Sequence, residues 1–373
     1  MGRLVLIIVS SLVTVGVLVG IDRGAEVLLN RWGYFMAMSP NLVLLYQASE
    51  FTTEVKISKQ GLRNREVVIP KPAGVYRILA LGDSFTFGWG VDEGKTWPRL
   101  VEAGLRERGL PVEVINAGVP GIGPFRERLI CQAYADQFGV DAFIIGLTHD
   151  DFLQSLGRRD TAGLVNKIID SLWPTVRRLW RREVGGQIGG SEMWREWVDA
   201  ALKRQPELLL RLDPVVRNDF VAGRLHPYVV FEAQSHSQIF IDLTRADYVK
   251  GGLKELSDQL GRLKRECTGV KPVVVIFFPP AALVSENYFE ALRQVGYEVK
   301  QELVKSNVDV PLKLVVERQG FDYVSPVAEL RRDGCPGCYF AYDGHMTPEG
   351  QQRMARMISA QLVLELDEFL TGE

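Results

Sequence analysis

The stretch Tyr76–Val91, which reads YRILALGDSFTFGWGV, joins an apolar run to a glycine-rich turn that carries a serine. A short run that is apolar nearly throughout predicts a strand of a parallel sheet whose two faces are both covered by helices. Ser84 then follows the carboxyl end of this strand, which is the edge where doubly wound sheets bind ligands. A serine hydroxyl is a weak nucleophile until a base takes its proton, so the role of Ser84 depends on what other segments bring to this edge.

Apolar strands and amphipathic helices alternate along the rest of the chain, which predicts an α/β domain with a doubly wound parallel sheet. A final helix is expected to begin at Pro348, with Thr347 as its N-cap. The predicted strands are residues 76–81, 112–115, 142–147, 273–278 and 321–324, and the other predicted helices are residues 96–108, 124–138, 253–265 and 287–304.

The connection between the third and fourth strands is far longer than a crossover needs, so we interpret residues 151–247 as an insertion. It contains basic, tryptophan-bearing segments around a glycine-rich break at residues 185–190. We interpret it as a helical subdomain with a solvated arginine face. The alternative is a lid over the site, or a surface that rests on anionic lipid or a partner. The surrounding domain is expected to span residues 75–370.

The N-terminal residues 4–21 are apolar and uncharged, and as a helix they would be roughly 27 Å long, close to the ~30 Å hydrocarbon core of a bilayer. No small-x-small cleavage site follows, which favours an uncleaved transmembrane helix within residues 1–22 over a signal peptide. Arginines on both sides of this segment leave its orientation open. Residues 23–74 are interpreted as a juxtamembrane lead-in, with strand character at residues 56–69 that is broken by Gly61 and Asn64.

Composition and short motifs argue against several classes of function. The formal net charge is −2, so no basic field favours nucleic acid. The turn after Ser84 lacks the lysine of a phosphate-binding P-loop, which argues against a nucleotide. Cys335 and Cys338 form a close pair, but zinc would need two more ligands, so a disulfide and a reduced loop stay as the two alternatives. We therefore expect neither a metal nor a cofactor.

The segment YDGHMTPEG, residues 342–350, supplies a candidate base. His345 lies two residues after Asp343, and in an extended segment both side chains lie on one side of the chain. Asp343 can then orient the imidazole and stabilise its protonated form. The alternative is a helix-capping turn in which His345 is merely exposed. The loop VINAGVPGIG, residues 114–123, offers the N–H of Gly118 as a donor to an oxyanion.

These segments resemble the sequence blocks of the GDSL esterase family, also called SGNH hydrolases. The matching blocks are GDSFTFG at residues 82–88, NAGVPG at 116–121 and DGHMTPEG at 343–350. The resemblance implies a flavodoxin-like, three-layer fold with Ser84 as nucleophile and first oxyanion donor, and Gly118 as the second donor. It also implies that Asp343 and His345 complete the triad. The lead-in is similar to that of membrane-anchored bacterial members, which implies a catalytic domain on the extracytoplasmic (periplasmic) side.

The family pattern has four blocks in fixed order, and the segment at the place of the third block departs from it. The family has Gly-x-Asn-Asp, whose Asn side chain donates to the oxyanion, whereas IIGLTHDDF at residues 144–152 contains no Asn. Aligned on the final Asp-Phe, Asp150 takes the Asn position, but aligned on spacing from Gly146, His149 does. An ionised Asp150 cannot donate, and it could donate only if burial raised its pKa enough to keep it protonated. His149 can donate from either ring nitrogen. Loss of one oxyanion donor lowers the rate on the order of a hundred- to a thousandfold.

We therefore expect a serine hydrolase that acts on carboxylic (acyl) esters through a Ser-His-Asp triad and an acyl-enzyme. The expected substrate is a small-molecule or glycan acyl ester, and the membrane is the second expected partner, through residues 4–21. Two alternatives stay open. One is an O-acyltransferase of a cell-envelope glycan, which passes the same acyl group to a sugar hydroxyl. The other is a catalytically impaired SGNH-like binding protein, which the missing Asn motivates.

Overall fold

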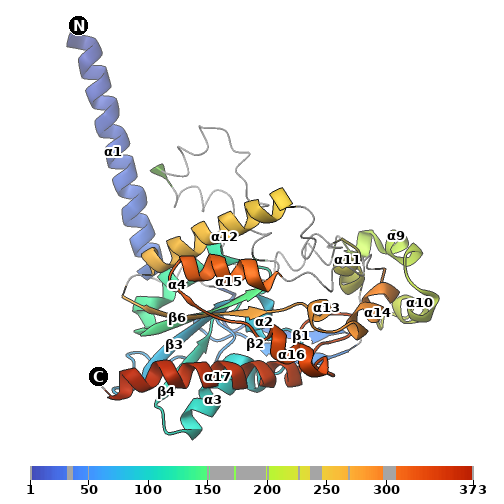
Figure 1. Cartoon of the computed structure of the whole chain (residues 1–373). Coiled ribbons are helices and arrows are strands. Elements are labelled where there is room, and N and C mark those ends of the chain that lie inside the picture. Colours follow the sequence, from blue (N-terminus) through green and yellow to red (C-terminus); the bar gives the residue numbers. More distant parts are fainter. Residues whose placement is uncertain are drawn as a thin grey trace.

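The structure is a computed structural model, whose elements are shown in Figure 1. It describes residues 2–31, 37–48, 50–148, 151, 172–173, 199, 201–225, 227–235, 246–267, 269–296 and 308–371. The predicted anchor, residues 4–21, lies within helix α1 (Gly2–Arg31), which projects away from the domain. Among the described residues, however, no helix is both long and apolar enough to span a bilayer, so the structure does not support the predicted transmembrane helix.

The central sheet has five parallel strands. Their spatial order is β4 (Val112–Asn116), β3 (Tyr76–Gly82), β5 (Ala142–Thr148), β6 (Lys271–Phe278) and β7 (Asp322–Val324). Every residue of β3, β4 and β5 is buried, as their apolar composition predicts. Counted along the chain, the order is 2-1-3-4-5, which confirms the predicted doubly wound sheet and its flavodoxin-like order. The order reverses between β3 and β5, so a ligand site is expected at the carboxyl ends of these two strands.

Helices cover both faces of the sheet, which gives the three predicted layers (Figure 1). Alternate residues of β3 divide the core: Leu79 and Leu81 pack in one cluster, and Ile78 and Ala80 in the other. The first cluster includes side chains of α4 (Pro124–Phe138), α12 (Ala246–Glu266) and α15 (Asp309–Arg318), and the second includes those of α3 (Trp97–Glu107), α16 (Val327–Asp333) and α17 (Pro348–Thr371).

The lead-in contains an antiparallel hairpin of two strands, β1 (Val43–Gln47) and β2 (Thr52–Lys56). The strand character predicted at residues 56–69 is wrong, because β2 ends at Lys56, where the prediction begins. The predicted break at Gly61 is confirmed. The residues that follow Lys56 form hydrogen-bonded turns around Gly61, whose φ of 77° is left-handed and breaks an extended strand. Their apolar side chains still enter the first core cluster.

The described part of the insertion is helical, and it packs beside the segment that follows β6. Phe220 of the insertion lies in a small separate core with Val295, which directly follows α14 (Asn287–Gln294). Most of the predicted tryptophan-bearing segments and the glycine-rich break lie outside the described residues, as does the second half of the helix predicted at residues 287–304. The short helices are α9 (Gln205–Leu210), α10 (Pro214–Val221) and α11 (Pro227–Ser235) in the insertion, and α13 (Ala281–Val284) after β6.

Two disulfides link segments of the domain. Cys131 of α4 is bonded to Cys267, which directly follows α12; their Cα atoms are 5.9 Å apart and their sequence separation is 136. Cys335 and Cys338 are bonded across a tight turn, with Cα atoms 5.5 Å apart, which we call the disulfide turn. Of the two alternatives for this close pair, the structure has the disulfide.

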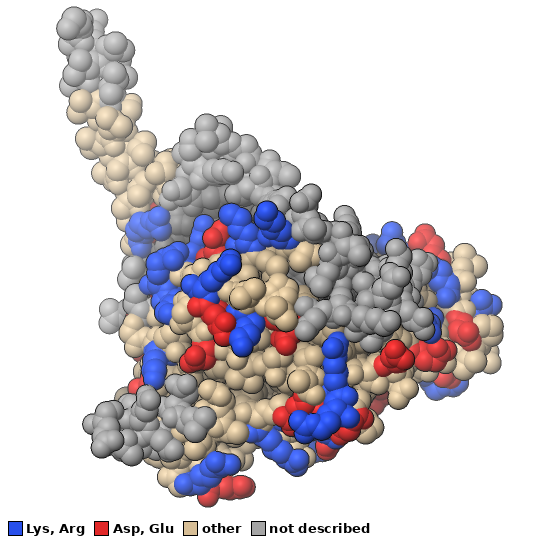
Figure 2. All heavy atoms as spheres, in the orientation of Figure 1, with Lys and Arg blue, Asp and Glu red and all other residues tan. Residues whose placement is uncertain are grey.

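Charged side chains of both signs are interspersed over the described part of the surface shown in Figure 2. The chain contains 44 basic and 46 acidic residues, so this mixture is the arrangement that its composition predicts. On the face drawn, the described surface therefore does not present a large field of one sign.

Candidate active site

A sharp turn carries Ser84 at the carboxyl end of β3. The strand ends at Gly82, and the short helix α2 (Ser84–Phe87) begins directly after Asp83. Asp83 caps this helix, because its Oδ1 accepts a backbone N–H of the first turn at 2.9 Å. Gly82 has no space for a side chain, since a Cβ there would lie 2.2 Å from Oγ1 of Thr86. The local sequence therefore builds a strand-to-helix turn that only glycine permits.

The three residues predicted as a triad lie together at this edge. His345 Nε2 is 2.7 Å from Ser84 Oγ, and His345 Nδ1 is 2.6 Å from Asp343 Oδ1. The Asp343 side chain is only 5% exposed, whereas that of His345 is 22% exposed. A proton on Nδ1 that is donated to the carboxylate leaves Nε2 free to accept the Ser84 hydroxyl proton. The helix-capping alternative for this segment does not account for the contact with Ser84.

Aromatic rings hold the imidazole in place. The ring centroid of His345 lies 4.9 Å from that of Phe85 and 5.8 Å from that of Trp89. Trp89 also donates its Nε1–H to Asp343 Oδ2 at 3.2 Å, so both carboxylate oxygens of Asp343 are engaged. Sequence reasoning did not find Trp89, although it follows the GDS turn by only a few residues.

Arg63 of the lead-in binds the backbone of the turn that follows Ser84. Its Nη1 donates to the carbonyl oxygens of Phe87 at 2.9 Å and Gly88 at 2.5 Å, and its Nη2 donates to that of Val91. The side chain is fully buried, and its guanidinium lies 4.7 Å from the centroid of the Phe87 ring. Burial lowers the pKa of Arg63 to about 10, so the group stays charged at neutral pH. Sequence patterns carried no signal for this residue.

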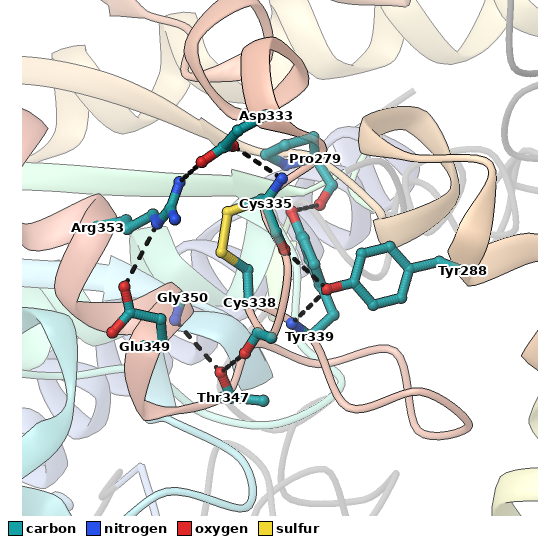
Figure 3. Close-up of a disulfide and its surroundings, with 11 residues drawn as sticks. Pro279, Tyr288, Asp333, Cys335, Cys338, Tyr339, Thr347, Glu349, Gly350 and Arg353 are labelled. Carbon is teal, nitrogen blue, oxygen red and sulfur yellow. Dashed lines mark hydrogen bonds and ion pairs between the residues drawn. A yellow bond between two sulfur atoms is a disulfide. The ribbon is translucent and has the colours of Figure 1, made fainter.

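The loop that carries His345 is tied to the disulfide turn (Figure 3). The N–H of Thr347 donates to the carbonyl oxygen of Cys338 at 2.9 Å, and its Oγ1 donates to that of Gly337 at 2.5 Å. The N–H of Phe340 donates to the carbonyl oxygen of His345 at 2.9 Å. These bonds close a small hairpin-like loop immediately before α17.

Gln351 of α17 connects the two halves of the site. Its Nε2 donates to the carbonyl oxygen of Phe85 at 3.1 Å, and its Oε1 accepts the N–H of Trp97 at 2.7 Å. The side chain is 1% exposed. The helix that follows His345 is therefore bonded to the helix that carries Ser84, although 266 residues separate the bonded pair.

Gly118, the predicted second oxyanion donor, uses its N–H within its own loop. This N–H donates to the side-chain oxygen of Asn116 at 3.0 Å. A Cβ at Gly118 would lie 2.3 Å from the backbone nitrogen of Phe87, so the glycine allows the loop to pack closely against α2. The geometry therefore gives Gly118 a packing role, and its N–H is already bonded to Asn116.

The residues that follow Gly118 in this loop offer a different backbone N–H as donor to an oxyanion. Val119 donates its N–H to the carbonyl oxygen of Gly82 at 3.0 Å, which holds the loop beside the end of β3. Pro120 has no N–H. Gly121 follows with a left-handed φ of 72°, and among the described residues its N–H has no hydrogen-bond partner. The second glycine of NAGVPG was the available sequence signal for this position.

The two candidates for the third donor, His149 and Asp150, lie outside the described residues. Their neighbours connect β5 to the nucleophile turn. The N–H of Thr148 donates to Asp151 Oδ2 at 2.6 Å, and its Oγ1 donates to Asp83 Oδ2 at 2.9 Å. This end of β5 therefore helps to orient the residue that precedes Ser84.

Glu127 is a buried carboxyl group in the first turn of α4. It is fully buried, and burial raises its pKa well above the usual value, with the neighbouring charge of Asp83 acting in the same direction. Within the described parts of the chain, no group of three or more His, Cys, Asp or Glu side chains could hold a metal ion. Burial and the charge of Asp83 therefore both disfavour the ionised form of Glu127.

The fold and the site define a class of protein. A doubly wound parallel sheet that holds serine, histidine and aspartate in hydrogen-bonded series at its carboxyl edge is the arrangement found in serine hydrolases on α/β folds. Residues 80–208 match the model of the GDSL-like lipase/acylhydrolase family. The match supports ester hydrolysis as the general class of activity. It ends before Asp343 and His345, which the structure places beside Ser84.

Several solved structures show distant similarity to this chain. TesA has 12% identity and a TM-score of 0.39, covering 77% of this chain and 97% of its own. Esterase EstA from Pseudoalteromonas sp. has 11% identity and a TM-score of 0.37, covering 78% of this chain and 98% of its own. A putative GDSL-like lipase from Parabacteroides merdae has 14% identity and a TM-score of 0.39, covering 77% of this chain and 94% of its own. Similarity at this level is too distant to assign an activity. No curated protein matches the sequence.

Proposed function

We propose that the protein is a serine esterase in which Ser84 is the nucleophile, His345 the general base and Asp343 the carboxylate that orients it. The observation that carries this proposal is the hydrogen-bonded series itself, with 2.7 Å between Ser84 Oγ and His345 Nε2 and 2.6 Å between His345 Nδ1 and Asp343 Oδ1. These are distances at which a base can take the serine proton as the oxygen attacks.

Acylation begins when Ser84 Oγ attacks the carbonyl carbon of the ester and its proton passes to His345 Nε2. The imidazolium that forms faces Asp343, whose negative charge stabilises it. The tetrahedral intermediate then breaks its bond to the alcohol oxygen, which receives the proton from Nε2 as it leaves. The product of this half of the reaction is an acyl group bonded to Ser84 Oγ and a free alcohol.

Deacylation repeats these steps with water. His345 takes a proton from a water molecule as the water oxygen attacks the acyl carbon. The second tetrahedral intermediate releases Ser84 Oγ, which recovers its proton from His345, and the carboxylic acid departs. A partly exposed imidazole beside a buried carboxylate suits both steps, because the base meets substrate and water while its partner stays desolvated.

Backbone amides are the expected donors to the oxyanion in both intermediates. The N–H of Ser84 at the start of α2 is one, since among the described residues it has no hydrogen-bond partner. We assign the second donor to the N–H of Gly121, because the N–H of Gly118 is bonded to Asn116. Each such donor contributes on the order of a hundred- to a thousandfold in rate.

We also propose that the domain works in an oxidising compartment, on the extracytoplasmic side that the sequence predicts. Two disulfides support this location, because disulfides persist in oxidising compartments and are rare in the cytosol. All four cysteines of the chain are paired.

The test is covalent labelling with a fluorophosphonate, followed by peptide mass spectrometry. We expect an adduct on Ser84 that is absent in Ser84→Ala and strongly reduced in His345→Ala. With a p-nitrophenyl ester, Asp343→Asn should lower kcat on the order of 10⁴-fold, because the imidazole then adopts the wrong tautomer. Labelling of the wild type at another residue, or full turnover by a folded Ser84→Ala variant, would contradict the proposal.

A further inference from the structure

The tip of the β1–β2 hairpin packs against the loop that carries Asp343. The N–H of Ala48 donates to the carbonyl oxygen of Phe51 and closes the tip. The ring of Phe51 lies 4.8 Å from that of Phe340, which is just upstream of Asp343, and the ring of Tyr46 lies 4.7 Å from that of Trp89. The hairpin therefore contacts both segments that meet around the imidazole. It lies outside the stretch that matches the family model.

Glu50, at this tip, binds three consecutive backbone amides of the loop. Its Oε1 accepts the N–H of Ala341, and its Oε2 accepts the N–H of Tyr342 at 3.1 Å and that of Asp343 at 2.9 Å. A carboxylate that accepts from three successive amides fixes the backbone there in one conformation. The last of the three belongs to the residue whose side chain contacts His345.

The position of this acid is electrostatically unfavourable for the folded chain. Burial raises the pKa of Glu50, and the charge of Asp343 raises it as well, whereas the three amides act in the opposite direction. A hairpin tip needs no half-buried acid beside a second acid for its own stability. Groups held in costly arrangements of this kind tend to occur at functional sites.

We propose that Glu50 is a positioning residue for the reaction, which holds the backbone of residues 341–343 so that the Asp343 carboxylate faces His345 Nδ1. This inference rests on the proposed function. Glu50 does not touch the substrate or the reacting atoms in this mechanism. It acts through Asp343, by preventing the loop from rotating the carboxylate away from the imidazole.

The test compares Glu50→Gln with Glu54→Gln in the full-length chain. Both remove one acid from the same hairpin, but Glu54 is half exposed and pairs with Lys56. A Gln amide presents an NH₂ to at least one loop N–H, so the loop loses part of its anchor. We expect Glu50→Gln to lower kcat for p-nitrophenyl acetate roughly 10- to 100-fold with KM within about twofold, and Glu54→Gln to match the wild type.

The readouts separate this proposal from the proposed function. If wild-type protein neither hydrolyses the ester nor labels at Ser84, the esterase proposal fails. Hydrogen–deuterium exchange of the amides of residues 341–343 still tests Glu50 in that case, and exchange in Glu50→Gln should be faster than in Glu54→Gln. Unchanged exchange there overturns the positioning role. So does an unchanged kcat, or a raised KM with unchanged kcat, in an active enzyme.

A second variant covers the case in which Glu50→Gln does not fold. Glu50→Asp keeps the charge but shortens the side chain by one methylene, so it cannot reach all three amides. We expect it to fold, to keep KM, and to show a kcat between those of Glu50→Gln and the wild type. A kcat equal to that of the wild type would show that catalysis does not need all three hydrogen bonds between Glu50 and the amides of residues 341–343.

Discussion

At the residue scale, Glu127 is a carboxyl group whose surroundings disfavour its charged form. It is fully buried beside Asp83, and neither of its carboxylate oxygens has a hydrogen-bond partner among the described residues. Burial raises its pKa well above the usual value, and the charge of Asp83 raises it further. Ionising Glu127 in the folded protein is therefore unfavourable, and its titration contributes to the pH dependence of stability.

We predict that Glu127→Gln stabilises the protein at pH 8 but not at pH 4. Below about pH 4 the wild-type carboxyl is protonated in both the folded and the unfolded chain, so it adds no pH dependence. As the pH rises, the unfolded chain releases this proton first, and the wild type loses stability until the folded group ionises too. Each unit of pKa shift corresponds to about 1.4 kcal/mol, and the Gln variant lacks this loss.

Denaturant unfolding at pH 4, 6 and 8 measures the difference in the free energy of unfolding between the Glu127→Gln variant and the wild type. Glu107→Gln, which removes an exposed acid from α3, is the control and should leave the pH profile unchanged. A difference for Glu127→Gln that stays constant from pH 4 to 8 would mean that Glu127 titrates as an ordinary carboxyl.

At the element scale, the two disulfides have different positions relative to the site. The bond between Cys131 and Cys267 joins α4 to α12 on one face of the sheet and closes a loop of 136 residues. The bond between Cys335 and Cys338 closes a turn of four residues that hydrogen-bonds Thr347, two residues after His345 (Figure 3). The first constrains a large part of the unfolded chain, and the second shapes the loop that carries the base.

We predict that the long-range disulfide matters more for stability, whereas the disulfide between Cys335 and Cys338 matters more for activity. In the chain-entropy model, removing the long-range bond lowers the free energy of unfolding by about 5 kcal/mol, and removing the short one lowers it by about 2 kcal/mol. The pair Cys335→Ser with Cys338→Ser should nevertheless lower kcat more than Cys131→Ser with Cys267→Ser, measured where both variants are folded.

Thermal unfolding and ester turnover of the two double variants make this comparison. Tyr288→Phe provides an independent check on the turn, because the Tyr288 hydroxyl donates to the carbonyl oxygen of Cys335 and accepts the N–H of Tyr339. It should lower kcat in the same direction with both disulfides intact. Equal kcat values for the two double variants would show that the disulfide turn does not influence the base.

At the scale of the whole molecule, the lead-in is part of the hydrolase domain. Its side chains Val55, Ile57, Leu62 and Val67 lie in the same core cluster as β3 and α4. Its polar residues reach the segments around Ser84, Asn116 and Asp343, through Arg63, Asn64 and Glu50 respectively. The boundary predicted near residue 75 therefore separates segments that share one core.

We predict that a chain starting at residue 76 does not fold, whereas one starting at residue 32 unfolds at the same temperature as the full chain. The four buried aliphatic side chains of the lead-in contribute about 6–12 kcal/mol, which is similar to the whole stability of a typical domain. Circular dichroism and thermal unfolding of both truncations test this. A cooperative transition in the shorter chain would show that the sheet folds without the lead-in.

The strands of the sheet were predictable because each is a short apolar run bounded by turn residues. β3, β4 and β5 lie within a residue of their predicted ends, and the alternation with helices predicted the parallel sheet. The flavodoxin-like order of the strands was implied by the resemblance to the GDSL family. The hairpin β1–β2 was missed because its outward side chains include large apolar residues such as Val43 and Leu45, which hide the alternation. Gly118 was chosen as donor because nothing local shows that Asn116 occupies its N–H.

The amino-acid sequence by itself determined the doubly wound sheet, the turn that exposes Ser84, and the pairing of Asp343 with His345. Each strand and turn, and the Asp343–His345 pair, is encoded by residues that are adjacent or a few positions apart. Only the tertiary structure decided that Glu50 and Arg63 support the site. Glu50 and the Asp343 amide are 293 residues apart in the chain, and a hydrogen bond depends only on the final distance between its atoms.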